Sequence, residues 1–230
     1  MSFVFNMITV GGGTSRQGLP NYTYDGSYDI IENSDGNWCM KFLGSGTLTF
    51  ASAQEIEVFL IGGGGAGGKT SEIWNGGGGG GYRTTGIIEV AAGSYDIVIG
   101  KGAASKANAG VAGGTTSAFG LTAAGGVTAN GGTGGAGGAK GGAGTSGSGA
   151  NGADGIAAFR DGETYGYYGG GGAGAAYGKG GLGGGASARG TDPGSGKAAA
   201  ANTGGGGSGG ANNTTSGAGG SGVILIRNVR

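Results

Sequence analysis

Apolar and polar residues alternate most clearly over residues 55–61, where Ile56, Val58 and Leu60 fall on one face of an extended chain. A period of two is the pattern of a β-strand that buries one side. Residues 223–229 begin with an unbroken run of four apolar residues, which is typical of a strand buried on both faces. Both segments therefore predict sheet.

Shorter patterns of the same kind predict further strands at about 82–90, 95–99 and 115–124. We expect residues 1–50 to form a β-rich N-terminal lead-in or attachment region. Residues 51–230 are expected to form a second, glycine-rich domain. The apolar residues suit this division, because only seven of the 36 Leu, Ile, Val and Phe residues lie between positions 101 and 222.

Glycine fills the segments between the strands and accounts for 69 of the 230 residues. Residues 131–139 repeat with a period of three, which matches a polyproline-II-type helix of three residues per turn. Such a helix has no internal hydrogen bonds, so its amides and carbonyls need partners on neighbouring segments. Any Cβ on an inward edge would hold those backbones apart.

The sequence therefore predicts an all-β fold: an antiparallel β-sandwich leading into a packed bundle of polyglycine-II helices over about 62–81 and 125–222, with essentially no α-helix. A flexible glycine linker is the alternative. It fits less well because the chain returns from the glycine tracts to an apolar strand. Within 131–139 we expect Gly134 to face inward and Thr133 and Ala136 to face outward. The glycines expected to be structural are Gly63, Gly64, Gly78, Gly79, Gly131, Gly134, Gly137, Gly171, Gly205 and Gly219.

One motif points to a different function. GGGAGGKT, residues 63–70, fits the phosphate-binding pattern G-x-x-x-x-G-K-[ST] and follows a predicted strand. That motif requires a helix after it, whose N-terminus receives the phosphate. Here six glycines, 76–81, follow within a few residues, and each costs a helix about 1 kcal/mol. We therefore expect no nucleotide binding.

Composition excludes several kinds of chemistry. The 13 basic and 13 acidic side chains balance, so no charge excess indicates a nucleic acid or a membrane as partner. Histidine is absent and Cys39 is the single cysteine, which removes the usual zinc sets and nucleophile pairs. Asp154 lies in a stretch similar to one turn of a calcium-binding repeat, but no tandem copies accompany it. We expect no catalytic residue, metal or cofactor. We also expect no signal peptide, because the first residues lack a basic region and a small-residue cleavage site.

Several motifs, in this order, resemble the glycine-rich domain of phage tail-fibre and tail-tip proteins, in which a β-sandwich leads into packed polyglycine-II helices. The motifs lie at 44–50, 58–68, 76–82, 98–103, 113–120 and 219–227. The resemblance implies a non-enzymatic virion tail or extracellular protein that attaches to a host. It implies as partners a bacterial cell-surface receptor, glycan or outer protein, together with other tail proteins and further copies of the same chain in a trimer.

Binding is expected in the loops that interrupt the tracts, because glycine tracts present little besides backbone. The loops at 69–75 and 212–216 are predicted at the end of the bundle far from the sandwich, whereas the position of 156–168 stays open. Packing or a subunit contact is the alternative use of the loop aromatics. The receptor-binding candidates are Lys69, Ser71, Trp74, Asn75, Phe159, Arg160, Asp161, Tyr165, Tyr167, Tyr168, Asn212 and Asn213.

Two other functions fit the same scaffold. One is a bacterial extracellular surface or matrix adhesin. The other is an ice-binding protein, which needs a flat and regular outer face. Lys140 breaks the three-residue period, and this disfavours such a face.

Overall fold

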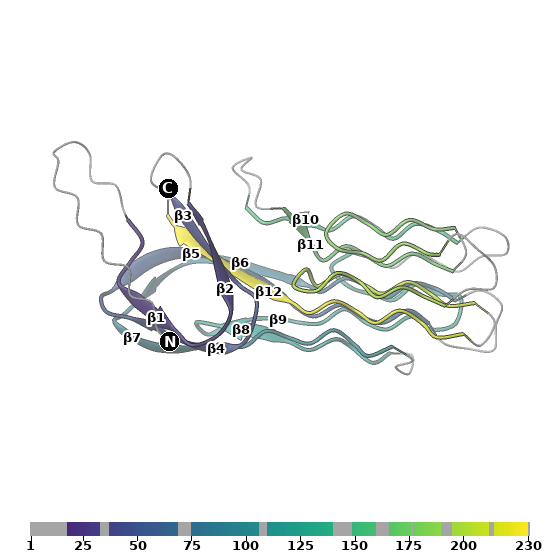
Figure 1. Ribbon diagram of the computed structural model, residues 1–230, viewed down its shortest axis with the longest axis horizontal. Coiled ribbons are helices and arrows are strands. Elements are labelled where there is room, and N and C mark those ends of the chain that lie inside the picture. The colour runs from purple at the N-terminus through teal and green to yellow at the C-terminus, as the bar shows by residue number, and fades with distance from the viewer. Residues whose placement is uncertain are drawn as a thin grey trace.

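The computed structural model describes residues 18–32, 37–68, 75–105, 110–139, 149–159, 166–175, 177–189, 195–211 and 214–229. Within these ranges the protein is all-β, with antiparallel sheets and no helix, as the sequence predicts. Figure 1 shows two parts: the larger sheets lie at one end, and long paired segments extend from them toward the other end.

A five-stranded antiparallel sheet has the order β2 (Tyr28–Glu32), β3 (Trp38–Phe42), β12 (Val223–Asn228), β5 (Gln54–Ile61) and β6 (Arg83–Val90). The apolar strand β12 lies at its centre, between β3 and β5, and all six of its residues are buried. In β5 the alternating residues Ile56, Val58 and Leu60 are fully buried, as their spacing predicts.

A second sheet contains β1 (Tyr22–Tyr24), β4 (Gly46–Phe50) and β7 (Gly93–Ile97). The main apolar core includes Leu48, Phe50 and Ile97 from this sheet together with side chains of the five-stranded sheet, so the two sheets form a sandwich. The hairpin β8 (Thr116–Ala118) and β9 (Leu121–Ala123) adds Ala118 and Ala123. Within residues 22–50, β1 pairs with β4. From the same region, β3 pairs with β12 and β4 pairs with β7, so the N-terminal region and the glycine-rich region share both sheets.

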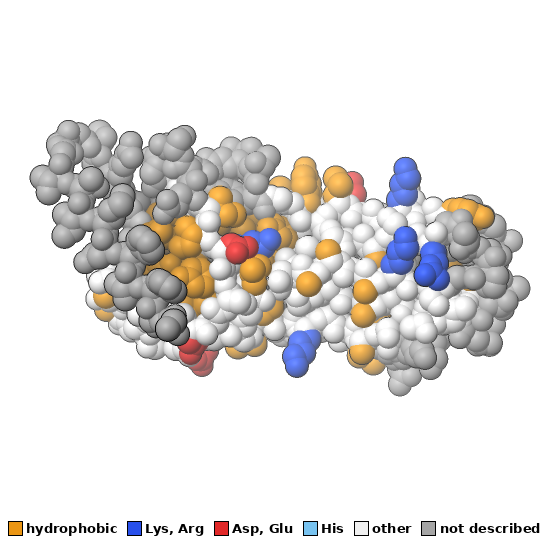
Figure 2. Space-filling view, in the orientation of Figure 1, with side chains coloured by type: hydrophobic (Ala, Val, Ile, Leu, Met, Phe, Trp, Pro, Cys, Tyr) orange, Lys and Arg blue, Asp and Glu red, His pale blue; other side chains and the backbone are white. Residues whose placement is uncertain are grey.

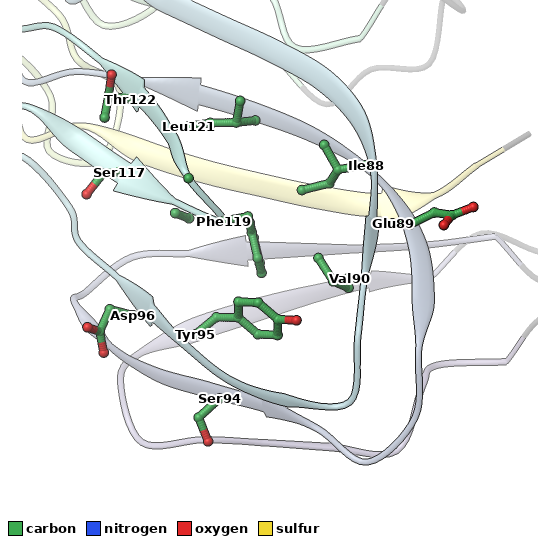
Figure 3. Close-up of a pocket in the computed structure, with 12 residues that line it drawn as sticks. Ile88, Glu89, Val90, Ser94, Tyr95, Asp96, Ser117, Phe119, Leu121 and Thr122 are labelled. Atoms are coloured by element: carbon green, nitrogen blue, oxygen red, sulfur yellow. The ribbon is translucent and has the colours of Figure 1, made fainter.

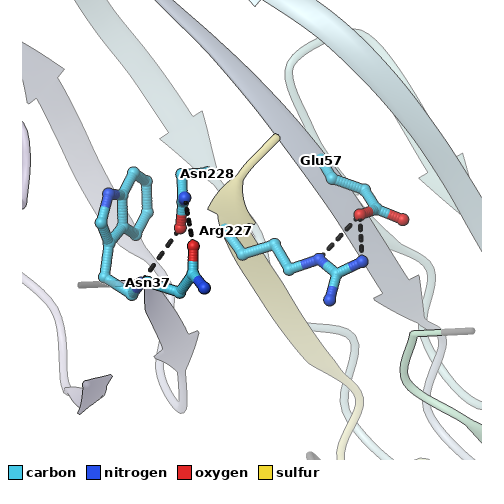
Figure 4. A network of polar contacts seen from close by, with 5 residues as sticks. Asn37, Glu57, Arg227 and Asn228 are labelled. Carbon is cyan, nitrogen blue, oxygen red and sulfur yellow. Dashed lines mark hydrogen bonds and ion pairs between the residues drawn. The ribbon is translucent and has the colours of Figure 1, made fainter. Parts of the chain in front are cut away.

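The outer face of the five-stranded sheet carries a buried ion pair (Figure 4). Arg227 Nε donates to Glu57 Oε2 at 2.7 Å, and Arg227 itself is 5% exposed. Next to it on β12, the Asn228 side chain accepts from the Trp38 amide at 3.0 Å and donates to Asn37 at 2.9 Å. These contacts fix β12 against both of its neighbours.

The glycine segments are joined by backbone hydrogen bonds with a period of three. Along 169–175, the amides of Gly170 and Ala173 donate to residues of 183–186. Those of Gly171 and Gly174 donate to residues of 149–155. Those of Gly172 and Ala175 donate to Gly78 and Asn75, respectively. Three residues per turn is the repeat of a polyglycine-II helix, so each face of this segment meets a different neighbour.

The packing is close enough to exclude side chains. A Cβ on Gly64 would overlap with the carbonyl oxygen of Gly205, and one on Gly219 would overlap with that of Gly64. The same holds for Gly63, Gly78, Gly79, Gly137 and Gly205, each against a backbone carbonyl of another segment. Gly171 is buried, and its amide donates to Ala153. Glycine is therefore required here for close approach of backbones.

The register within 131–139 differs from the expectation. Gly131 has φ of 53° in a turn that is closed by two hydrogen bonds between Asn130 and Thr133. Gly134 is half-buried, and the fully inward position is Gly135, whose Cβ would overlap with the Val127 carbonyl oxygen. Thr133 and Ala136 are exposed as expected. The turn uses the first residues of the repeat, so the packed segment begins later than the sequence period suggests.

Candidate functional site

The bundle has an end near the sheets and a far end. Gly62 follows β5 directly, and the segment runs away from the sheet until the amide of Gly68 donates to Gly76. The described residues on either side of 69–74, 190–194 and 212–213 meet at this far end. The amide of Gly196 donates to Thr215, and the Asn75 side chain reaches Gly210. Figure 1 shows this end opposite the sheets.

Asn75 has a structural position rather than the exposed one expected of a receptor-binding residue. Its side chain is buried, and Nδ2 donates to the carbonyl oxygen of Gly210 at 2.8 Å. Its own carbonyl oxygen accepts from the Ala175 amide. Asn75 thus joins three segments at the far end, where its buried side-chain amide is hydrogen-bonded to the Gly210 carbonyl.

The described residues of the segment 156–168, which are 156–159 and 166–168, lie at the other end, beside the sheet. The short strands β10 (Ile156–Ala157) and β11 (Tyr167–Tyr168) pair as a hairpin, and the ring centroids of Phe159 and Tyr168 lie 5.9 and 5.7 Å from that of Phe59 on β5. This position is visible in Figure 1.

Phe159 and Tyr168 are each only 4% exposed, so the expectation that they face a receptor is corrected. The Arg227 guanidinium lies 4.1 Å from the Phe159 ring centroid, and Lys41 Nζ lies 5.4 Å from that of Tyr168. Burial raises the pKa of Tyr168 to about 12, with a smaller contribution from the nearby Cys39 thiol. The two rings pack on the apolar outer face of the sheet. Of the two uses expected for the loop aromatics, binding or packing, these two residues serve packing.

Tyr167 points the other way and is 52% exposed. It is the one tyrosine of this hairpin, among the described residues, that offers an open ring for binding. The remaining candidates fall outside the described residues, so their roles stay predictions. They are Lys69, Ser71, Trp74, Arg160, Asp161, Tyr165, Asn212 and Asn213.

The described amides of the GGGAGGKT motif, those of residues 63–68, already donate hydrogen bonds within the protein. Those of Gly63, Gly64 and Gly65 donate to Gly114, Gly220 and Gly79, and that of Gly67 donates to Gly217. A phosphate-binding loop needs such amides to converge on the ligand. Here they point to separate neighbours, because the segment is a polyglycine-II helix.

A groove that the sequence did not indicate lies between β6, β7 and the β8–β9 hairpin, with a volume of about 550 Å³ (Figure 3). Tyr95 and Phe119 line it, with ring centroids 5.3 Å apart. Phe119 and Gly120 have φ of 53° and 77° between the paired residues Ala118 and Leu121, which is the geometry of a type I′ turn. Phe is an uncommon residue for such a turn, so the strand pattern over 115–124 does not indicate this turn type.

Neither a metal cluster nor a membrane-spanning helix occurs in the described part of the chain. No group of three or more His, Cys, Asp or Glu side chains converges there. None of the described segments is a helix long and apolar enough to cross a bilayer. Asp154 instead accepts a hydrogen bond from the amide of Leu182 at 2.8 Å, where it ties two segments together.

Sequence comparison identifies the family of this chain. The model of the glycine-rich domain family matches residues 43–228, which include strands β4 to β12 and the whole bundle but not β1, β2 and β3. The chain belongs to this glycine-rich domain family. A comparison with curated protein sequences gives no match.

Proposed function

We propose that this protein is a phage or prophage tail-fibre or tail-tip structural protein that binds a host-surface receptor through the segments at the far end of its glycine bundle. The observation that carries the proposal is the arrangement of that end. Several chain passages meet there, and the sequence interrupts its glycine tracts between them with larger polar and aromatic residues. A rigid scaffold that presents variable loops is a common design for recognition.

The backbone bonding of the bundle supports this use. Because hydrogen bonds between main-chain groups hold the segments, the loops can change in sequence without loss of the core. Lys69, Ser71, Trp74, Asn212 and Asn213 are the candidates whose flanking residues lie at the far end. Trp74 offers the largest rigid ring, and aromatic residues of this kind are enriched at binding hot spots.

The proposed partners are a bacterial surface receptor, either a glycan or an outer protein, and other tail proteins, with assembly of the chain into a trimer. The alternative is a bacterial surface or matrix adhesin, which would bind through the same far-end loops. Immunogold labelling separates the two: the phage protein labels the tips of tail particles, and the adhesin labels the cell envelope.

Cell adhesion tests the binding role. Fluorescently labelled protein is incubated with a panel of bacterial strains, and Trp74→Ala is compared with Tyr167→Ala, which changes an exposed ring at the sheet end. We expect Trp74→Ala to lower adhesion about tenfold or more, as loss of a hot spot does, while Tyr167→Ala and both melting temperatures stay close to wild type. Equal adhesion of the two variants would contradict a far-end site.

A further inference from the structure

The balanced net charge conceals a separation of charge along the molecule. The glycine segments 62–81, 99–155 and 169–222 contain seven Lys and Arg but three Asp and Glu residues. The rest of the chain contains six basic and ten acidic residues. The bundle is therefore net positive and the remainder net negative, although the totals cancel.

Three of the basic residues lie on adjacent segments of the bundle. The amide of Ala188 donates to Gly178, and that of Gly180 donates to the Ser187 hydroxyl, so the segments that carry Arg189 and Lys179 run side by side. The segment that carries Lys197 adjoins the Arg189 segment on its other side. The amide of Ala200 donates to Gly184 there.

These contacts set an antiparallel register. In it, Ser187 has Lys179 on one neighbouring segment and Lys197 on the other, and Arg189 follows two residues later toward the far end. All three charged side chains are exposed, and we call them the basic strip. Figure 2 shows Lys and Arg side chains gathered over this part of the bundle.

No acidic side chain among the described bundle residues lies within the basic strip. The single described acid of the bundle is Asp154, which is engaged with the amide of Leu182 near the sheet end of its segment. Tyr177 is 58% exposed and lies two residues before Lys179. The surface therefore combines spaced cations with an open aromatic ring.

We propose that the basic strip binds an anionic polymer with regularly spaced phosphate or carboxylate groups, with Tyr177 beside it to stack on a sugar ring. Single exposed charges bind weakly because water and salt screen them. A repeating polyanion engages several cations at once, and a positive surface also raises the rate of its encounter. The inference rests on the proposed function only for the source of the polymer, a bacterial surface.

Binding to defined polymers tests the proposal on the whole protein. Sodium polyphosphate supplies phosphate, polygalacturonate supplies carboxylate, and dextran supplies neither. The variant Lys179→Gln/Lys197→Gln is compared with Lys101→Gln/Arg83→Gln, which removes the same charge from exposed positions outside the strip. Thermal melting verifies that both variants are folded. We expect them to be, because the substituted side chains are exposed.

We expect wild type to bind at least one polyanion in 50 mM NaCl, not to bind dextran, and to lose the complex in 500 mM NaCl. The strip variant should bind at least tenfold more weakly, and the control variant within about twofold of wild type. Preference for one polyanion identifies phosphate or carboxylate as the group recognised. Absence of polyanion binding, or equal weakening by both variants, overturns the proposal. Either result leaves the adhesion test of Trp74 unaffected, because that test measures a different surface.

Discussion

A Cβ on Gly80 would overlap with the carbonyl oxygen of Gly169, although 88 residues separate the two positions along the chain. Both neighbouring backbones are fixed by hydrogen bonds: the amide of Gly80 donates to Ala139, and that of Gly169 donates to Thr203. Neither can move aside without loss of bonds. The spacing of these two backbones therefore depends on the absence of a Cβ at Gly80.

Gly80→Ala should therefore destabilise the protein strongly. Overpacking a close-packed interior costs about 1–3 kcal/mol, and here the clash is with a backbone atom. The control is Gly86→Ala on β6, where a Cβ would meet nothing closer than 3.7 Å. We expect chemical denaturation to show a large loss for Gly80→Ala and little change for Gly86→Ala. Similar stability of the two variants would argue against close packing.

The ion pair between Arg227 and Glu57 predicts that two glutamates of the same strand differ in their contribution to stability. Glu57→Gln removes the carboxylate that pairs with the Arg227 guanidinium, and Arg227 is 5% exposed. Loss of one partner of a fully buried ion pair costs about 3 kcal/mol of stability. We expect a smaller loss here because the Glu57 side chain is 25% exposed. Glu55→Gln, on an exposed position of the same strand, should change little. Urea denaturation of both variants measures the difference, and equal midpoints would contradict it.

Tyr168 predicts loss of stability at alkaline pH. Burial holds its pKa at about 12 in the folded protein, whereas an unfolded tyrosine ionises near the ordinary value of 10. The unfolded chain therefore loses this proton first, and stability that is complete below pH 10 falls as the pH rises toward 12. Tyr24, whose pKa burial also raises to about 12, adds to the effect.

The measurement is the melting temperature between pH 9 and pH 12. Tyr168→Phe should decline less steeply than wild type, because the group that ionises is gone. Tyr167→Phe serves as the control, since it removes the hydroxyl of a neighbouring tyrosine whose ring is exposed. Parallel pH profiles for Tyr168→Phe and wild type would show that the phenol is not the cause.

The glycine loop that precedes Lys69 should not bind nucleotides. Its amides already donate to carbonyl groups of other segments, so a phosphate would have to displace those bonds. Titration calorimetry with ATP and GTP in the presence of Mg²⁺ should detect no heat of binding. Nucleotide binding that Lys69→Ala abolishes would reverse this conclusion.

Much of the fold follows from the sequence because its periods are strong. The alternation at Ile56, Val58 and Leu60 marks β5, and the apolar run marks β12 as a central strand. The register of the tract at 131–139 does not follow, because a turn stabilised by Asn130 and Thr133 shifts the packed repeat. Hydrogen bonds within a turn compete with those of the packed repeat, and the three-residue glycine period does not indicate where a turn forms instead.

The candidate site was less predictable for a related reason. Phe159 and Tyr168 are of residue types that serve both binding and packing, and only their contact with Phe59 on the sheet decides between the two. Asn75 similarly reads as an exposed loop residue until its side chain is seen to bond Gly210. Long-range contacts of this kind leave no signal in the spacing of residues along one segment.

Amide hydrogen exchange along residues 169–175 tests the central claim most directly. In the bundle, the six amides from Gly170 to Ala175 donate in turn to three neighbouring segments, so the account predicts slow exchange throughout this stretch. Protection should be comparable to that of β12 at the centre of the sheet. Exchange at the rate of an unstructured glycine chain would show instead that the segment is a linker, and would contradict a backbone-bonded bundle.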